Sequence, residues 1–272
     1  MKQDMDYRFA NENIPKLILS LSAPAIAAQV INALYNVVDR MYIGHIPGVG
    51  ADALTGVGVT MPFIMAISAF AALVSMGGAP RASIMMGKGE KDKAENILGN
   101  CASMLVVIAV VLTAAVLIFG KQILLMFGAS EKTVGYAWAY MQIYAMGTIF
   151  VQLALGLNAF INAQGYATMG MLTVLIGAVL NIILDPIFIF GFGLGVRGAA
   201  WATILSQAVS SFWVVKFLTG KRSFLRIRTR YLRPRTKILL PCIALGISPF
   251  IMQFTESILN ICFNTSLLKY GG

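Results

Sequence analysis

The chain has 272 residues, of which 58% are hydrophobic and only 12% charged, and its mean hydropathy is +0.78. This composition excludes a soluble globular domain and predicts an all-α polytopic membrane protein. The formal net charge is +10, but the basic residues fall between apolar segments, so they indicate membrane topology and not nucleic-acid binding.

Seven apolar stretches are long enough to cross a bilayer as helices, which takes about 20 residues each. They lie near residues 15–43, 54–80, 97–120, 134–162, 170–192, 198–218 and 238–268. If the amino terminus is cytoplasmic, 16 of the 21 Lys and Arg residues lie inside, and the five outside are Arg40, Lys121, Lys132, Arg197 and Lys269. The positive-inside rule therefore predicts a multi-pass protein of the cytoplasmic (inner) membrane with its amino terminus in the cytoplasm.

The first of these stretches carries a polar stripe. Gln29, Asn32, Asn36 and Asp39 are spaced i, i+3, i+7 and i+10, which places all four on one helix face. A carboxylate inside an apolar span is costly and indicates ion or proton chemistry. An ion pair between Asp39 and Arg40 is the alternative, but successive helical residues point in different directions. Gln29, Asn32 and Asn36 are candidates for lining the polar pathway, with helix-helix hydrogen bonding as the alternative.

The fifth stretch contains a second embedded acid. Asn181 and Asp185 are four residues apart and share one helix face, and Pro186 frees a backbone carbonyl one turn back. This pattern predicts an oxygen-rich pocket. Asn158 in the fourth stretch is a further candidate for cavity lining, and Thr203 in the sixth supplies a hydroxyl near the acids, unless its own backbone satisfies it. If Asp39 and Asp185 face one cavity, its occupancy by a proton or a cation can be coupled to a change of shape.

A basic segment divides the chain. Residues 219–237 (TGKRSFLRIRTRYLRPRTK) predict a cytoplasmic linker between an amino-terminal six-helix lobe, residues 1–218, and the first helix of a second lobe, residues 238–272. The same segment could attract anionic lipid headgroups as well as setting topology.

The seventh stretch repeats features of the first. Pro24 and Pro249 both follow a serine within two residues and lie 225 positions apart, and each precedes a polar helix face. Six helices separate the two segments' starting points, which suggests a parallel repeat whose second copy is cut short here. Glu256 is a third embedded acid and a possible second cation site.

Four motifs resemble the multidrug and toxic compound extrusion (MATE) family, the drug/cation antiporters with two six-helix bundles. They are VDRMYIGH at 38–45, MGKGEKDKAEN at 86–96, GLNAFINAQGYATMGM at 156–171 and NIILDPIFIFGFGLGVRGAAWATILSQ at 181–207. The resemblance implies that Asp39, Asn181, Asp185 and Thr203 form a cation- or proton-coupling network, with Na⁺ as a possible ligand of the first three. It also implies that Glu256 matches a seventh-helix acid of some members.

The sequence therefore predicts an antiporter that exports small amphipathic organic cations in exchange for H⁺ or Na⁺. No cofactor besides the coupling ion is expected, and the expected partners are membrane lipid and a carboxy-terminal lobe that this sequence lacks. Two alternatives remain, a lipid-linked sugar flippase of related fold and a truncated product that does not transport. A membrane enzyme is disfavoured because the chain has no HExxH motif or paired acidic cluster, and its single histidine, His45, falls in an external loop.

Overall fold

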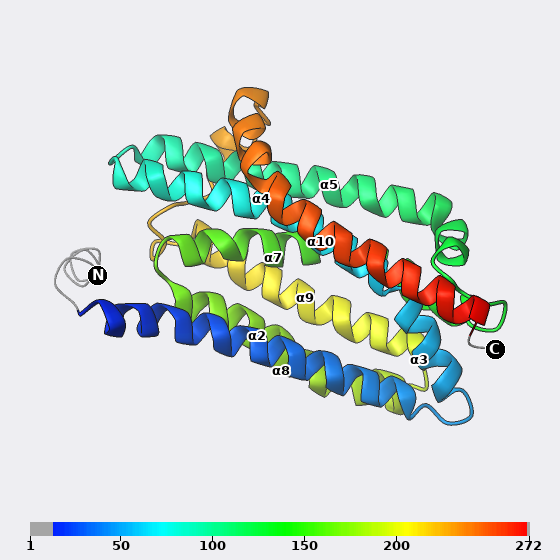
Figure 1. Cartoon of the computed structure of the whole chain (residues 1–272). Helices are drawn as coiled ribbons and strands as arrows, with labels where there is room; N and C mark the ends of the chain where they lie inside the picture. Colours follow the sequence, from blue (N-terminus) through cyan, green and yellow to red (C-terminus); the bar gives the residue numbers. More distant parts are fainter. Residues whose placement is uncertain (1–12, 271–272) are drawn as a thin grey trace.

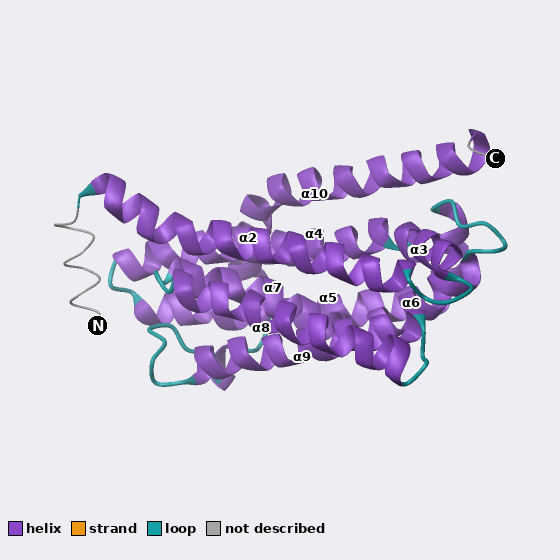
Figure 2. Ribbon diagram, turned by 90° about the horizontal axis from the view of Figure 1, so that it is seen from below, coloured by secondary structure: helices purple, strands orange, loops and turns teal. Residues whose placement is uncertain are grey.

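The computed structural model describes residues 13–270, and every regular element within that range is helical (Figures 1 and 2). In chain order the elements are α2 (Ile14–Gly44), α3 (Gly50–Val59), α4 (Met61–Gly87), α5 (Lys91–Met126), α6 (Val134–Met146), α7 (Thr148–Ala163), α8 (Ala167–Pro186), the π-helical turn η1 (Ile187–Gly191), α9 (Val196–Thr219), the 3₁₀ turn η2 (Thr229–Tyr231) and α10 (Thr236–Tyr270). Six segments are long and apolar enough to cross a bilayer, and α6 with α7 makes a seventh if the bent pair counts as one span. The predicted all-α polytopic membrane fold is confirmed.

Two predicted spans are interrupted helices. The sequence predicts one helix over residues 134–162, whereas α6 and α7 meet at Gly147 with a bend of 59°. A Cβ atom at Gly147 would lie 2.1 Å from Cδ1 of Ile204, so only glycine lets α9 approach the bend this closely. The second span breaks briefly at Thr60, between α3 and α4, where Pro62 occupies the first turn of α4 and needs no hydrogen-bond acceptor.

The helices pack as a bundle in which α2 lies along α8, α9 lies against both α7 and α8, and α4 contacts α5, α7 and α10 (Figure 1). Buried apolar side chains form two clusters. One includes Ile43, Ile67 and Ile204, and the other includes Leu98 and Phe160. The start of α2 and the end of α10 lie at opposite ends of the bundle, as an odd number of spans requires (Figures 1 and 2).

Helices α4 and α10 touch through their backbones. A Cβ atom on Gly77 would lie 1.8 Å from the carbonyl oxygen of Cys242, and one on Gly246 would lie 1.8 Å from the carbonyl oxygen of Leu73. Close approach through small residues is a common way for membrane helices to associate, because lipid provides no hydrophobic force between them. Further along the same contact, the Ser257 hydroxyl donates to the Pro62 carbonyl at 2.7 Å.

The glycine contact gives a direct stability prediction. Gly77→Ala should force α4 and α10 apart and lower the free energy of unfolding by about 1–3 kcal/mol, the usual cost of overpacking. Gly135→Ala is the matched control, since a Cβ atom there meets nothing within 4 Å. Thermal unfolding of the purified protein in detergent would measure both, and equal midpoints for the two variants would contradict the packing described here.

Candidate functional site

The structure brings together the four residues predicted as the coupling network. Asp39 on α2 and Asp185 on α8 have their carboxyl groups within hydrogen-bonding reach of each other. Asp185 is fully buried and Asp39 partly so. Asn181, one turn before Asp185, donates from Nδ2 to Oδ1 of Asp185 at 3.2 Å and to Oγ1 of Thr203 on α9 at 3.4 Å. Three neighbouring helices therefore meet at a single polar site.

The acid pair does not use Arg40 as its partner. The ion pairs found among residues 13–270 do not include Asp39 with Arg40, and Arg40 lines a separate cavity of about 410 Å³ near the carboxy-terminal end of α10. The alternative reading of Asp39 as half of a local ion pair is therefore not supported. Thr203 does donate to its own backbone, at the Ala199 carbonyl 3.0 Å away, while still accepting from Asn181.

The site contains more oxygen atoms than it has donors for. Asp39 Oδ1, Asn181 Oδ1 and Asp185 Oδ2 are buried without a hydrogen-bond partner. Buried acceptors are rarely left unpaired, and two adjacent carboxylates repel each other strongly where the dielectric constant is low. Carboxylate, amide and hydroxyl oxygens are the ligands that hard cations prefer. The donor set therefore fits a small hard cation or a shared proton.

Two residues of the site, Asp39 and Asp185, supply carboxylate oxygens, and two others, Asn181 and Thr203, supply an amide and a hydroxyl oxygen. Within the described part of the chain, no group of three or more His, Cys, Asp and Glu side chains is placed to hold a metal ion.

A turn of π-helix follows the site directly. Pro186 ends α8, and the chain continues into the wider turn η1 before α9. Gly198 lets α9 pass close to this turn, since a Cβ atom there would lie 2.6 Å from the Phe188 carbonyl oxygen. Widened turns of this kind occur often beside functional sites. Asp185 therefore sits at the junction between a regular and an irregular helical segment.

Tyrosines surround the acid pair, and they were not among the predicted site residues. Tyr140 on α6 is buried with its side chain near Thr203, and its ring stacks on Tyr144 with centroids 6.0 Å apart. Tyr35 on α2 contacts Asn36 within the same region. The signal was present in the sequence, because Tyr136, Tyr140 and Tyr144 repeat at four-residue spacing and so share a helix face.

The predicted cavity-lining residues divide into two groups. A cavity of about 50 Å³ is lined by Asn32, Asn158, Asn181 and Thr203 among others, which is room for very few water molecules. Gln29 and Asn36 are not part of its wall. Gln29 is exposed, and Asn36 donates to the Asn32 carbonyl at 2.7 Å.

Glu256 lies apart from this site. It is exposed on α10, which packs against α4 and α5 rather than against α2 or α8. Its backbone carbonyl accepts from Asn260 Nδ2 at 2.8 Å, and the same amide contacts Met65 Sδ at 3.3 Å. The structure thus does not join Glu256 to the acid pair, and a second cation site there stays a prediction.

These features define a polytopic membrane protein with an oxygen-lined site between its spans. The sequence model of the MatE family matches residues 24–187, which is more than half of the chain and includes both acids. The chain belongs to this family.

Solved structures and curated relatives agree with this assignment. The chain is 26% identical over its whole length to the multidrug export protein MepA of Staphylococcus saprophyticus, and 25% identical to that of Staphylococcus aureus, in each case covering 60% of the relative. It also matches an inward-facing multidrug resistance MATE family transporter of the MOP superfamily with a TM-score of 0.82 and 29% identity, covering 91% of this chain and 58% of the other. The family is one of transporters rather than enzymes. The chain spans about 60% of the length of the curated relatives it matches.

Proposed function

We propose that the chain forms the amino-terminal lobe of an antiporter that exchanges H⁺ or Na⁺ for small amphipathic organic cations. In this proposal residues 1–218 are the lobe, residues 219–237 the cytoplasmic linker and residues 238–272 the first helix of a second lobe. The amino terminus lies in the cytoplasm and the transporter in the cytoplasmic membrane, as the distribution of Lys and Arg favours.

One observation carries the proposal. Asp39 and Asp185 stand on different helices and leave buried oxygens unpaired, so a cation or proton between them relieves their repulsion and draws α2 toward α8. A ligand can shift a conformational equilibrium only through its different affinity for two states. A site shared by two helices provides that difference, because its geometry depends on how α2 and α8 lie relative to each other.

Coupling to an exported drug then follows from linkage. If the occupied site favours the state that releases drug outward, the drug must favour the unoccupied state by the same factor. The proposal gives each residue a part: Asp39 and Asp185 hold the cation, Asn181 fixes the orientation of Asp185, and Thr203 completes the oxygen set.

The comparisons support a lobe that keeps its shape while the transporter changes state. The chain matches an inward-facing and an outward-facing MATE family transporter with the same TM-score of 0.82. Equal similarity to the two states is what a lobe that rocks as a unit against a partner would give. The partner in this proposal is a carboxy-terminal lobe that closes the other side of the central cavity.

The flippase alternative has less support. A flippase for a lipid-linked sugar must accommodate a phosphate, and the charged side chains in the site between α2 and α8 are both acids. A truncated product that does not transport would keep the same acid pair, so the transport experiment is what distinguishes it.

Ion gradients imposed across a membrane test the proposal and show whether Na⁺ or H⁺ is the coupling ion. The two-lobe transporter would be reconstituted in proteoliposomes, and a Na⁺ gradient or a pH gradient imposed while ethidium movement is followed by fluorescence. One of the two gradients is expected to drive ethidium against its own gradient. Ethidium movement that responds to neither gradient would contradict the proposed exchange.

A further inference from the structure

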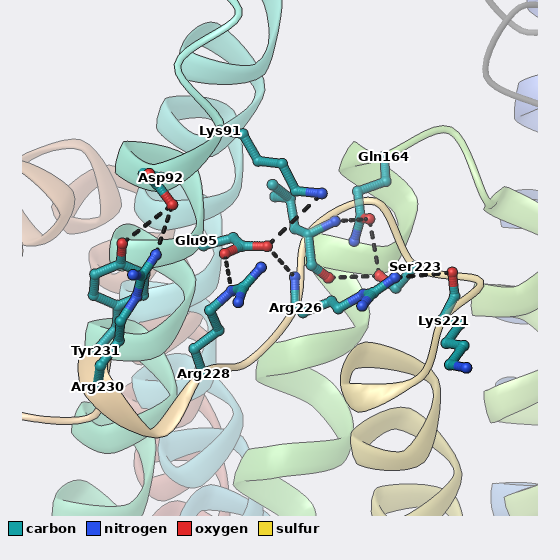
Figure 3. Close-up of polar contacts among 11 residues, drawn as sticks. Lys91, Asp92, Glu95, Gln164, Lys221, Ser223, Arg226, Arg228, Arg230 and Tyr231 are labelled. Atoms are coloured by element: carbon teal, nitrogen blue, oxygen red, sulfur yellow. Dashed lines mark hydrogen bonds and ion pairs between the residues drawn. The ribbon is translucent and has the colours of Figure 1, made fainter.

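The segment that joins α9 to α10, residues 220–235 and here called the basic loop, is held against the start of α5 and the end of α7 (Figure 3). Its first part is fixed by Gln164 at the end of α7. The Gln164 Oε1 atom accepts from the Ser223 hydroxyl at 3.0 Å and from the Leu225 amide at 2.8 Å. Ser223 and Leu225 are both buried. This segment is therefore a shaped part of the protein rather than a free linker.

Two acids of α5 hold the middle of the basic loop (Figure 3). Glu95, whose side chain is fully buried, pairs with Arg228 and accepts from the Arg226 amide at 3.4 Å. Asp92 accepts from Arg230 at 2.7 Å and from the Tyr231 hydroxyl at 3.3 Å. The hydrogen bond and charge of Glu95 raise the pKa of the Arg228 guanidinium above its ordinary value. Arg228 and Arg230 are thus paired with acids of α5.

The last part of the basic loop is fixed through its backbone. Asn100 Oδ1 accepts from the Arg235 amide at 2.6 Å, and Asn100 Nδ2 donates to the Tyr231 carbonyl at 3.3 Å. Gly99 allows this approach, since a Cβ atom there would lie 2.8 Å from the same carbonyl oxygen. The backbone from Tyr231 to Arg235 is therefore held in place by Asn100.

Among the described residues, the acids nearest the basic loop in the sequence of α5 already have partners. Glu90 is paired with Lys93 at 2.9 Å, and Asp92 and Glu95 are occupied by the basic loop. Within residues 13–270, five exposed cations on or beside this loop lack an ion pair: Lys221, Arg222, Arg233, Arg235 and Lys237. The basic loop therefore has two kinds of cation. Arg228 and Arg230 are neutralised by acids of α5, and the five named above have no ion pair among the described residues.

We propose that these five cations form a docking surface for the headgroups of anionic phospholipid in the adjoining leaflet. The loop connects two helices of membrane-spanning length, so its ends stay at the lipid surface. Large apolar side chains are exposed close to these cations in the chain, at Leu232 next to Arg233 and at Leu240 one turn after Lys237. A cationic rim next to exposed apolar groups fits the boundary between headgroups and acyl chains better than it fits a polyanion in water.

The test compares lipid retention by the purified chain. The protein would be incubated in neutral detergent with phosphatidylglycerol or phosphatidylcholine, and bound lipids counted by native mass spectrometry. Phosphatidylglycerol should be retained in preference, and less so as salt is raised. The triple variant Arg233→Gln/Arg235→Gln/Lys237→Gln should reduce its retention by about tenfold or more while leaving phosphatidylcholine unchanged, given the attraction of each cation near the surface.

A matched control distinguishes the effect of this surface on lipid retention from the effect of net charge. The triple variant Lys121→Gln/Lys132→Gln/Arg197→Gln removes the same charge from exposed positions at the opposite end of the bundle. It should retain phosphatidylglycerol like the unaltered protein. Equal losses in the two triple variants, or no preference for phosphatidylglycerol over phosphatidylcholine, would overturn the proposal. Neither outcome depends on transport, so the result stands apart from the proposed exchange function.

Discussion

Replacing Asp185 with Asn is expected to abolish cation-driven drug efflux by the proposed two-lobe transporter. Asn keeps the size of the side chain and can still contact Asn181, but it removes the charge that attracts a cation or takes up a proton. Without that charge the site between α2 and α8 no longer responds to the external ion, so drug and ion are no longer linked. Ethidium efflux from cells that lack their own exporters would measure the loss, which should reach the level of cells without the transporter.

The control for this substitution is Asp52→Asn. Asp52 is an exposed acid in the first turn of α3, outside the coupling site. Its replacement should leave efflux unchanged, and Asp39→Asn should act in the same direction as Asp185→Asn. Efflux that persists in the Asp185→Asn transporter at the rate of the Asp52→Asn transporter would remove Asp185 from the coupling mechanism.

Replacing Arg228 with Met is expected to destabilise the protein by about 2 kcal/mol, the typical cost of leaving a buried charged group without its partner. Glu95 is fully buried, and after the change it keeps only the Arg226 amide and a distant contact with Lys91 at 4.0 Å. Because the hydrogen bond and charge of Glu95 raise the pKa of the Arg228 guanidinium, Arg228 keeps its charge through the physiological pH range. Thermal unfolding in detergent, followed by circular dichroism, would measure it.

Arg230→Met is the matched control for the ion pair. Arg230 pairs with Asp92, whose side chain is 78% exposed, so water compensates the carboxylate when the arginine is removed. Its loss should cost less than about 1 kcal/mol. Adding Glu95→Gln to Arg228→Met should recover part of the stability, because the buried charge is then gone as well. If Arg230→Met proved as destabilising as Arg228→Met, burial of Glu95 would not be the cause.

The residues of the proposed coupling site were identifiable from the sequence because most of them gave a strong local signal. Asp39 and Asp185 are charges inside apolar stretches, and Asn181 is four residues, about one helical turn, before Asp185. Their meeting was harder to foresee, since it depends on α2 lying along α8. The family resemblance supplied that step, and the structure places the two carboxyl groups within reach of each other.

The tyrosines and the bend at Gly147 needed tertiary information. Nothing in the apolar run from 134 to 162 distinguishes Gly147 from other glycines tolerated in membrane helices. Its role depends on Ile204, which is 57 positions away and fills the space that a side chain would need. Tyr140 lies near Thr203 because α6 packs against α9, which the sequence does not reveal.

The ordered structure of the basic loop could not be predicted from its composition. A run rich in Lys and Arg between two spans predicts a cytoplasmic linker. Its inner arginines are instead paired with Asp92 and Glu95, which the sequence pattern presents as ordinary acids at the start of a helix. The pairing is invisible in the sequence because more than 130 positions separate the partners.

Direct ion binding to the purified chain tests the central claim most simply, because it requires neither a second lobe nor a drug. The thermal midpoint would be followed while Na⁺ is raised at alkaline pH, and while pH is lowered without Na⁺, for the unaltered chain and for Asp185→Asn. A bound ion stabilises the folded state by mass action, so the unaltered chain should respond to Na⁺ or to pH, and Asp185→Asn should lose that response. Identical responses of the two proteins to both ions would contradict a coupling site at Asp39 and Asp185.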